Sequence, residues 1–285
     1  MPSVRDLRDR IKSLKNTQQI TKAMKQVAAA KIRRADQAQK QARPYADALD
    51  GMLRDLIEAV GTVDHPFMKP GKEGVPKGVI LMTADKGLAG AFNSNVIREG
   101  ERYAREAGGV TWYAIGNKAR NAVRRRGATA EISEALGSRA KLELAQEVAA
   151  RVTDDFVAGK ISEIVLVSSR LISTMIQRPE SRTLVPIVPE KKEAASGPRA
   201  VVEFSPSPEA VLTRLLPKYL EFTIFSAMLE TDAAFFSAQL IAMTNATDNA
   251  GKLLDELTLA MNKARQAAIT KEMLEIVGGA EAQAG

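Results

Sequence analysis

The chain has 285 residues, of which 45 % are hydrophobic and 26 % charged, with a net charge of +7 at neutral pH. A chain of this length and composition can bury a core in one large domain or two ordinary ones. The absence of cysteine excludes disulfides and thiolate metal sites, and a single histidine restricts the chemistry further.

The N-terminus, MPSVRDLRDR, carries charges where a signal peptide has its apolar stretch. No apolar run approaches the roughly 18 residues that a membrane-spanning helix needs. We therefore expect a protein that is neither secreted nor inserted into a membrane by itself. The one histidine, His65, stands in a polar, glycine-rich and proline-rich stretch, and we expect it to be an ordinary loop residue.

Residues 1–60 predict one long helix with the spacing of a coiled coil. Small or apolar residues recur at alternating steps of three and four, which is typical of a seam between two helices. The seam consists of Leu14, Thr17, Thr21, Met24, Ala28, Lys31, Ala35, Ala38, Ala42, Tyr45, Leu49, Met52, Leu56 and Ala59. A helix of this length would measure about 80 Å, so we expect it to project from any domain. Pro44 argues against a continuous helix, because a proline inside a helix kinks or interrupts it.

This first helix also carries the excess positive charge. Residues 1–43 hold twelve Lys or Arg residues against three Asp, a local charge of +9 that exceeds the +7 of the whole chain. Such a segment should bind an anionic partner, which the sequence alone leaves open among nucleic acid, anionic lipid and an acidic protein surface.

Residues 75–205 predict an α/β domain. Short β-branched runs at 78–84, 110–116, 163–169, 183–189 and 200–204 indicate strands, and helices are expected at 94–107, 117–126 and 139–158. Because strands and helices alternate at first, the early strands should form a parallel sheet. The later strands lack intervening helices and should pair antiparallel, with a polar connection over 190–200.

Residues 207–285 predict a second very long helix that ends at Gly278 and Gly279. Its seam near the end includes Leu254, Leu257, Met261, Ala264 and Ala268. We expect the two terminal helices to bury their seams on each other as an antiparallel coiled coil. The predicted fold is therefore a Rossmann-like α/β domain with a long antiparallel coiled coil.

Three stretches are candidates for a catalytic or ligand-binding site. TADKGLAGAFNSN (83–95) stands between a strand and a helix but matches no phosphate-binding glycine spacing, so we interpret it as a tight turn that needs glycine. Asp85 and Lys86 lack a neighbouring nucleophile or metal cluster, which favours a solvated turn. Glu272 and Glu275 lie one turn apart without a histidine, which favours a solvated or partner-facing surface. We expect no catalytic residue, cofactor or metal.

The chain resembles a known family over its whole length. NTQQITKAMKQVAAAKIRRA (16–35), LMTADKGLAGAFN (81–93) and ATDNAGKLLDELTLAMNKARQAAITKEMLEIVGGAEA (246–282) are similar to the gamma subunit of the rotary, proton-translocating ATP synthase. The C-terminal motif is the most specific of the three; its matching residues are Ile269, Thr270, Glu272, Glu275, Gly279, Ala280 and Ala282.

The resemblance implies a noncatalytic rotor shaft. In the family the coiled coil stands inside a hexamer of alpha and beta subunits, and the α/β domain is a foot that binds the epsilon subunit and rests on the ring of c subunits. Rotation of the ring turns foot and coil together and changes the conformation of the beta subunits, which make ATP. The implied location is peripheral, at the cytoplasmic face of a bacterial cell membrane.

By the same resemblance, two groups of residues are expected to contact alpha and beta subunits: Lys22, Met24 and Lys25 near a beta lever, and Arg265, Gln266, Thr270, Glu272 and Glu275 near the tip. The chain departs from the family pattern at two points. Ala238, Gln239 and Leu240 replace an expected Ala-Arg-Met, and Met261 replaces a tyrosine.

Two other functions remain open at this stage. A coiled-coil scaffold that binds nucleic acid through its basic arm would show a steep salt dependence, although residues 1–43 contain no aromatic side chain for stacking on bases. An α/β nucleotide-binding enzyme would require residues 75–205 to retain nucleotide.

Overall fold

The computed structural model describes residues 3–60, 65–69, 71–187 and 207–284. They form two compact units, the first made of Met1–Ala29 with Gln239–Gly285 and the second of Ala30–Ala238. The predicted strand at 200–204 and the polar connection at 190–200 lie outside the described residues. Two helices account for nearly all of the first unit, namely the start of α1 (Val4–Val60) and the end of α5 (Pro208–Ala284).

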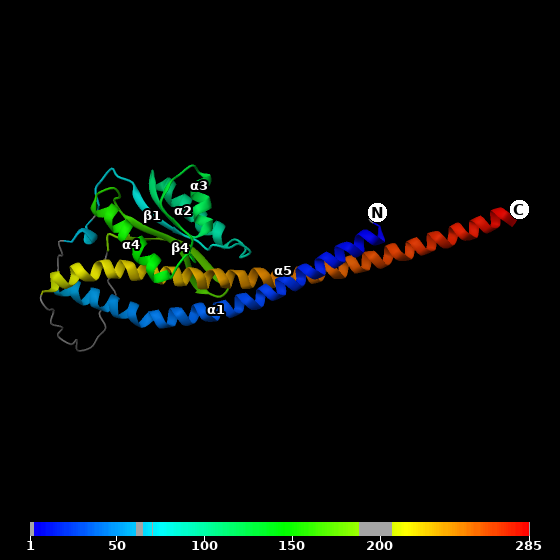
Figure 1. The fold of residues 1–285 in the computed structure, drawn as a ribbon, viewed down its shortest axis with the longest axis horizontal. Coiled ribbons are helices and arrows are strands. Elements are labelled where there is room, and N and C mark those ends of the chain that lie inside the picture. The colour runs from blue at the N-terminus through cyan, green and yellow to red at the C-terminus, as the bar shows by residue number, and fades with distance from the viewer. Residues whose placement is uncertain (1–2, 61–64, 70, 188–206, 285) are drawn as a thin grey trace. The chain divides into compact units, whose positions relative to one another are not determined.

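The two helices of the first unit run antiparallel. The hydroxyl of Thr247 on α5 lies 2.8 Å from that of Thr21 on α1. Three residues earlier on α1, Gln18 lies opposite Gly251, four residues further along α5, where a Cβ would be 3.2 Å from the amide nitrogen of Gln18. Because α1 numbers fall as α5 numbers rise, the pair is antiparallel, as predicted, and Figure 1 shows α1 beginning beside α5.

The second unit contains a five-stranded sheet in the order β3-β2-β1-β4-β5. Its strands are β1 (Lys77–Met82), β2 (Val110–Ile115), β3 (Ala130–Glu134), β4 (Ile164–Ser173) and β5 (Ile176–Val185). The first four are parallel, and β5 pairs antiparallel with β4 as a hairpin. Helices α2 (Phe92–Glu106), α3 (Asn117–Arg125) and α4 (Lys141–Val157) connect the parallel strands, and a short 3₁₀ helix, η1 (Pro66–Met68), precedes β1. The predicted Rossmann-like pattern is confirmed; β3 had no predicted counterpart.

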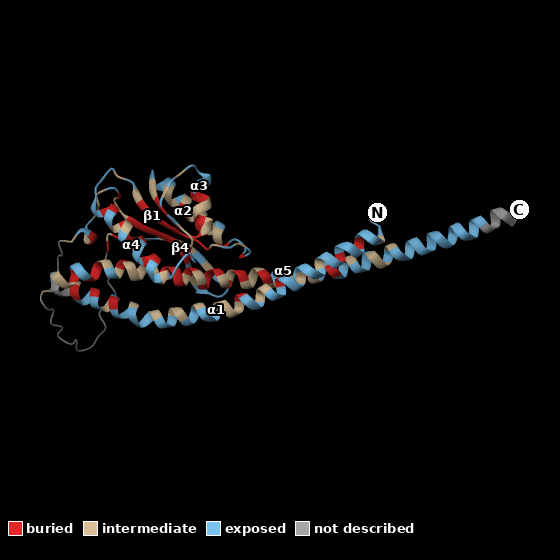
Figure 2. Ribbon diagram, viewed as in Figure 1, coloured by how far each residue is buried: buried red, intermediate tan, exposed pale blue. Residues whose placement is uncertain are grey.

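Each face of the sheet is covered, which is why its central strands are apolar on both sides. On one face, side chains of β1 and β2 such as Val79 and Trp112 pack with α2 and α3 residues such as Val96 and Val123. The other face packs on α4 and on both long helices in one large cluster. Figure 2 shows the buried residues concentrated along β1 and β4 and along the part of α5 in this unit, while α1 is buried mainly near its end.

That second cluster corrects one prediction. The sequence predicted that the long helices bury their seams only on each other. In the structure, Leu212, Leu216 and Ile224 of α5 are fully buried in the cluster that includes the sheet. The first third of α5 is apolar around most of its circumference, so it is covered by the sheet as well as by α1. Two ring contacts tie α1 to it in this unit: Tyr45 packs edge-on to Phe222, and the Lys31 ammonium lies over Phe236.

The predicted α1 seam is partly wrong. Thr17, Tyr45 and Met52 are exposed, although Tyr45 keeps its ring contact. In each case the next residue turns inward: Gln18 and Ala46 are half-buried and Leu53 is buried. The seam residues that repeat every seven positions, Thr21, Ala28, Leu49 and Leu56, stay buried. At the three exposed positions the other half of the seam is displaced by one residue, because positions i+3 and i+4 both lie on the face of residue i.

Glycine and proline do not interrupt the helices as predicted. α1 continues through Pro44, which is exposed, so the carbonyl of Lys40 that loses its donor faces water. α5 continues past Gly278 and Gly279 to Ala284. A glycine inside a helix costs only about 1 kcal/mol relative to alanine, so two glycines weaken the helix without ending it. His65 is also more than a loop residue, because its Nδ1 accepts the Phe67 N–H and caps η1.

A buried carboxylate joins α4 to the sheet. Asp155, whose side chain is 5 % exposed, accepts hydrogen bonds from Tyr113 Oη at 2.8 Å, Arg151 Nε at 2.9 Å and Lys160 Nζ at 3.0 Å. Burial disfavours the charged carboxylate, but these three hydrogen bonds outweigh burial and lower the pKa of Asp155. Burial and the neighbouring carboxylate raise the pKa of the Tyr113 phenol, which therefore stays a donor.

Gly116, between β2 and α3, allows no side chain. Its φ is +93°, and a Cβ would lie 2.0 Å from the carbonyl oxygen of Thr83. We expect Gly116→Ala to lower the free energy of unfolding by more than about 2 kcal/mol, from backbone strain and the clash together. Gly127 is the control, since its φ is +70° but no atom lies within 4 Å of its Cβ position; Gly127→Ala isolates the strain. Equal losses in urea unfolding of the two variants would contradict the clash.

Candidate partner-binding surface

The eight residues predicted to contact partners all lie in the first unit, in two groups that the structure keeps apart. Lys22, Met24 and Lys25 are on α1 beside α5, and Arg265, Gln266, Thr270, Glu272 and Glu275 are on α5 beyond the start of α1. The two groups therefore form two surfaces rather than one site.

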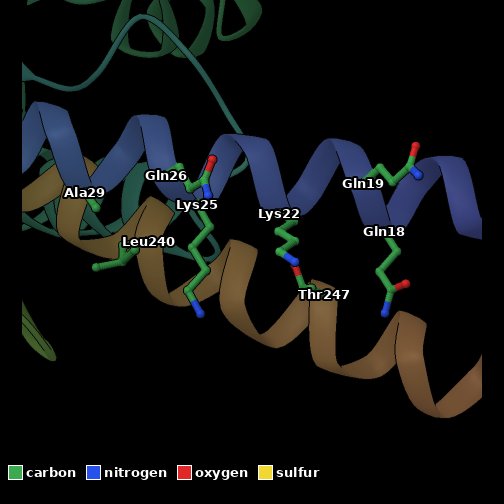
Figure 3. A pocket seen from close by; sticks show the side chains of 8 residues that line it. All are labelled: Gln18, Gln19, Lys22, Lys25, Gln26, Ala29, Leu240 and Thr247. Carbon is green, nitrogen blue, oxygen red and sulfur yellow. The ribbon is translucent and has the colours of Figure 1, made fainter.

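The first surface is a groove of about 500 Å³ between the helices, which we call the lysine groove. It is lined by Gln18, Gln19, Lys22, Lys25, Gln26, Ala29, Leu240 and Thr247. Figure 3 shows Gln18, Lys22 and Lys25 reaching from α1 toward α5, while Gln19 points away. Met24, which is half-buried, does not line the groove.

The lysine groove is positively charged. None of its eight lining residues is acidic, and among the described residues neither Lys22 nor Lys25 forms an ion pair. Two unpaired ammonium groups beside amide and hydroxyl groups suit a carboxylate-bearing partner, since opposite charges within a few ångströms attract and no internal carboxylate competes. The sequence located the two lysines but missed Gln18, Leu240 and Thr247, which only the pairing of the helices brings to them.

The helix interface beside the groove is polar and closely packed. Thr21 donates to the carbonyl of Gln18 at 3.0 Å, and the Thr247 hydroxyl shares its one proton between the Thr21 hydroxyl at 2.8 Å and the carbonyl of Met243 at 2.7 Å. Thr21 is buried, as are its neighbours Ala28 and Ala250. Small residues allow the backbones to approach, and the paired hydroxyls satisfy the polar groups that this approach buries.

The hydroxyl pair is open to a double-mutant test. We expect Thr21→Val and Thr247→Val each to lower the free energy of unfolding by about 1 kcal/mol, because each removes the hydrogen bond that joins the two helices, while the remaining hydroxyl keeps the carbonyl of its own helix as acceptor. The double variant should lose less than the sum of the two, since it removes both hydroxyls together. Strict additivity in thermal unfolding would contradict a direct contact. Thr17→Val, at an exposed residue whose hydroxyl bonds only to its own helix, is the control.

The second surface is the part of α5 that extends beyond α1, and we call it the α5 tip, residues 265–279. Leu7 and Ile11 are the last buried residues of α1 toward its start. Ala264 is the last half-buried residue of α5, and every residue of the α5 tip is exposed, as Figure 2 shows. Ala268 was predicted to pack on the N-terminal helix, but it is exposed because α1 does not reach it.

The α5 tip exposes large apolar side chains together with its polar ones. Ile269, Met273 and Ile276 recur at steps of four and three along the helix, and Ile276 is 72 % exposed; Leu274 and Val277 are exposed beside them. Thr270 bonds to the carbonyl of Gln266, and Lys271 pairs with Glu275 across 3.5 Å. An apolar stripe that the chain itself leaves uncovered marks a surface for a partner.

The two residues that depart from the family pattern, Gln239 and Met261, differ in how far they are buried. Gln239 is buried and Met261 is half-buried. In the described residues there is no group of acidic side chains and histidine that could hold a metal ion. Within the same residues, no helix is both long and apolar enough to cross a membrane.

The turn between β1 and α2 has the conformation of a tight turn. Gly90 and Leu88 both have positive φ, +57° and +60°, and Asn93 accepts the Ala84 N–H and donates to the carbonyl of Lys86. Asp85, however, is not a solvated turn residue as predicted. It is half-buried and accepts three backbone N–H groups from other loops.

Comparison with known proteins gives a consistent result. A family model described as ATP synthase matches residues 3–283. The ATP synthase gamma chain of Desulforamulus reducens is 45 % identical over 283 aligned residues, and that of Heliobacterium modesticaldum 42 % over 289, each covering 99 % of both chains. Among solved structures, a chain of the Euglena gracilis mitochondrial ATP synthase, OSCP/F1/c-ring in rotational state 3, aligns with a TM-score of 0.65 at 18 % identity, over 98 % of this chain and 94 % of that one.

Proposed function

The chain belongs to the ATP synthase gamma-chain family, and from this premise we propose how its surfaces work. It is the central rotor shaft of the enzyme and a noncatalytic subunit, which couples proton-driven rotation to conformational change and ATP synthesis elsewhere in a membrane-associated complex. No cofactor is assigned to it. Its solved fold neighbours come from central stalk and F1/c-ring assemblies, and its working parts are three: the N-terminal helix 1–60, the foot 75–205 and the C-terminal helix 207–285.

The observation that carries this proposal is the uncovered α5 tip. A single helix that leaves its partner at Ala264 and exposes an apolar stripe needs an external surface around it. Alpha and beta subunits supply that surface as a bearing. Arg265, Gln266, Thr270, Glu272 and Glu275 make polar contacts with the bearing, while the apolar stripe slides along its wall without fixed hydrogen bonds.

The lysine groove contacts the beta subunits in turn. Lys22 and Lys25 attract an acidic lever segment, and Met24 packs beside it. Long-range attraction between charges needs no single geometry, which suits a shaft that meets three copies of the same partner. The foot binds the epsilon subunit and the ring of c subunits, which places the chain peripherally at the cytoplasmic face of the membrane.

A cysteine crosslink tests the bearing. The chain has no cysteine, so Glu275→Cys introduces a unique thiol. Paired with a cysteine on an alpha or beta subunit of the assembled enzyme, it should stop ATP turnover when oxidised and restore it when reduced. Asp154→Cys, on an exposed residue of α4, is the control and should leave turnover unchanged under oxidation.

The composition of the complex is tested separately. The affinity-tagged chain should co-purify with alpha, beta and epsilon subunits and the c ring, and it should hydrolyse no ATP by itself. Hydrolysis by the isolated chain, or capture without alpha and beta, would overturn the proposal.

A further inference from the structure

Asp85 stands at the carboxyl edge of the parallel sheet, where open α/β folds ordinarily receive a ligand. It belongs to the loop between β1 and α2, three residues after Met82. The loops that follow β2 and β3 reach the same edge. In this chain the side chain that enters the space among the three loops is a carboxylate of the protein itself.

The carboxylate of Asp85 binds both neighbouring loops. Its Oδ1 accepts the N–H of Asn117, after β2, at 3.0 Å and the N–H of Leu136, after β3, at 2.9 Å. Its Oδ2 accepts the N–H of Gly137 at 2.9 Å. Three converging backbone donors are a typical arrangement for holding an anion, and here they hold an internal one.

The same loop completes the start of helix α3. The residue before this helix, Gly116, has no side chain to cap it. Three consecutive residues of the β1–α2 loop act instead: Thr83 Oγ1 accepts the Ala119 N–H at 2.8 Å, the Ala84 carbonyl accepts the Lys118 N–H at 3.4 Å, and Asp85 accepts the Asn117 N–H. The first-turn donors of α3 are thus satisfied from another loop, with a negative charge at the positive end of the helix.

The outer part of the loop is held in an unfavourable conformation. Leu88 has a φ of +60°, which is rare for a branched side chain, and it is 63 % exposed. Asp85 anchors one side of this segment, and Asn93 anchors the other through its two hydrogen bonds to Ala84 and Lys86. Strained residues persist where the surrounding contacts fix them.

We propose that Asp85 is a positioning residue that acts as a built-in anion. Its carboxylate occupies the space at the sheet edge in place of a bound ligand, joins the loops after β1, β2 and β3 into one rigid block, and holds the segment 86–88 outward. The inference goes beyond the rotor function, since it concerns how the foot is made rigid.

Chemical rescue in the full-length chain tests this role. Asp85→Ala removes the carboxylate and leaves space for a small one. In this variant, hydrogen exchange at the amides of Asn117, Leu136 and Gly137 should accelerate about tenfold or more, because each loses a charged acceptor. Sodium formate, compared with sodium chloride at equal ionic strength, should restore slow exchange.

Three controls define the outcome. The wild-type chain and Asp85→Asn, which keeps the side-chain volume and leaves no space, should not respond to formate. Asp154→Ala removes an exposed aspartate and should exchange as the wild type does. Unchanged exchange in Asp85→Ala would overturn the proposal, and so would faster exchange throughout the second unit that formate does not reverse, because that pattern indicates general destabilisation. If Asp85→Ala does not fold, Asp85→Asn must still accelerate exchange at Gly137, whose N–H would face the new amide NH2 group in place of an oxygen, and failure to do so would also overturn it.

Discussion

Lys22→Glu combined with Lys25→Glu lowers the rate of proton-driven ATP synthesis by roughly tenfold, with a much smaller effect on assembly. Both lysines line a groove without acidic residues, so reversing them would replace attraction for the proposed acidic lever by repulsion. An exposed ion pair contributes roughly 0.2–1 kcal/mol, so changing two such charges costs on the order of 1.4 kcal/mol, which corresponds to a tenfold loss of rate. The rate is measured in membrane vesicles energised by respiration, with subunit content measured on the same vesicles.

Matched controls separate the groove from general charge. Lys12→Glu with Lys15→Glu makes the same change of net charge at two exposed residues of the same helix that do not line the groove. This control should keep most of the synthesis rate. The loss in the groove variant should shrink as ionic strength rises, because salt screens exposed charges. Equal losses in the two variants, or none in either, would remove the proposed role of the groove.

The second large effect concerns stability of the foot. Asp155→Ala should lower the free energy of unfolding by about 1–3 kcal/mol, because it leaves the hydroxyl of the fully buried Tyr113 without an acceptor, whereas the exposed Arg151 and Lys160 can be solvated. The variant deprives Tyr113, Arg151 and Lys160 of their shared acceptor. Urea unfolding measures the loss, and Asp154→Ala, the exposed neighbour on α4, should change stability by less than about 0.5 kcal/mol.

The pH dependence of the same variant has a defined sign. The folded pKa of Asp155 is lowered from an ordinary value of 3.8, so its contribution to stability is fully present above pH 3.8 and is lost as the pH falls through the folded pKa. The difference in stability between the wild type and Asp155→Ala should therefore be constant near neutral pH and shrink below pH 3.8. A difference that grew in acid would contradict the charged role of Asp155.

Periodicity predicted the helices well and their interfaces less well. Thr21 and Ala28 are buried as the seam required, and so is Leu56. Tyr45 and Met52 are exposed because the next residues, Ala46 and Leu53, face inward instead, and a sequence pattern does not distinguish a step of three from a step of four on one helix face. The burial of α5 against the sheet could not be predicted from one helix, since apolar residues on several sides indicate burial without naming the neighbour.

In the foot, the buried strands were predicted from the sequence and the exposed edge strands were largely missed. β1 and β2 are apolar runs covered on both faces, and both were predicted. β3 was missed because it is an edge strand of five residues with Ile132 alone buried, which leaves no apolar pattern. Most of β5 was missed for a related reason: its polar residues and Pro179 are compatible with a strand at the sheet edge.

The sequence predicted the charge and the exposure of the candidate surfaces, but not the full set of residues that form them. Lys22 and Lys25 stand out by charge, and the exposed tip follows from the length of the second helix. Gln18 and Thr247 meet across the helix pair from distant parts of the chain, and no local pattern relates them. Asp85 was misjudged because its three partners belong to loops 32, 51 and 52 residues away.

The hydroxyl pair of Thr21 and Thr247 has a mechanical consequence. Alanine-rich surfaces are nearly uniform along a helix, so two such helices could slide past each other by a turn at little cost in packing. A slide would separate the two threonines and lose the hydrogen bond between them, worth about 1 kcal/mol, while each hydroxyl kept the carbonyl of its own helix as acceptor. The pair therefore favours one axial alignment of the two helices. This alignment resists slippage of one helix along the other when torque is applied to the shaft.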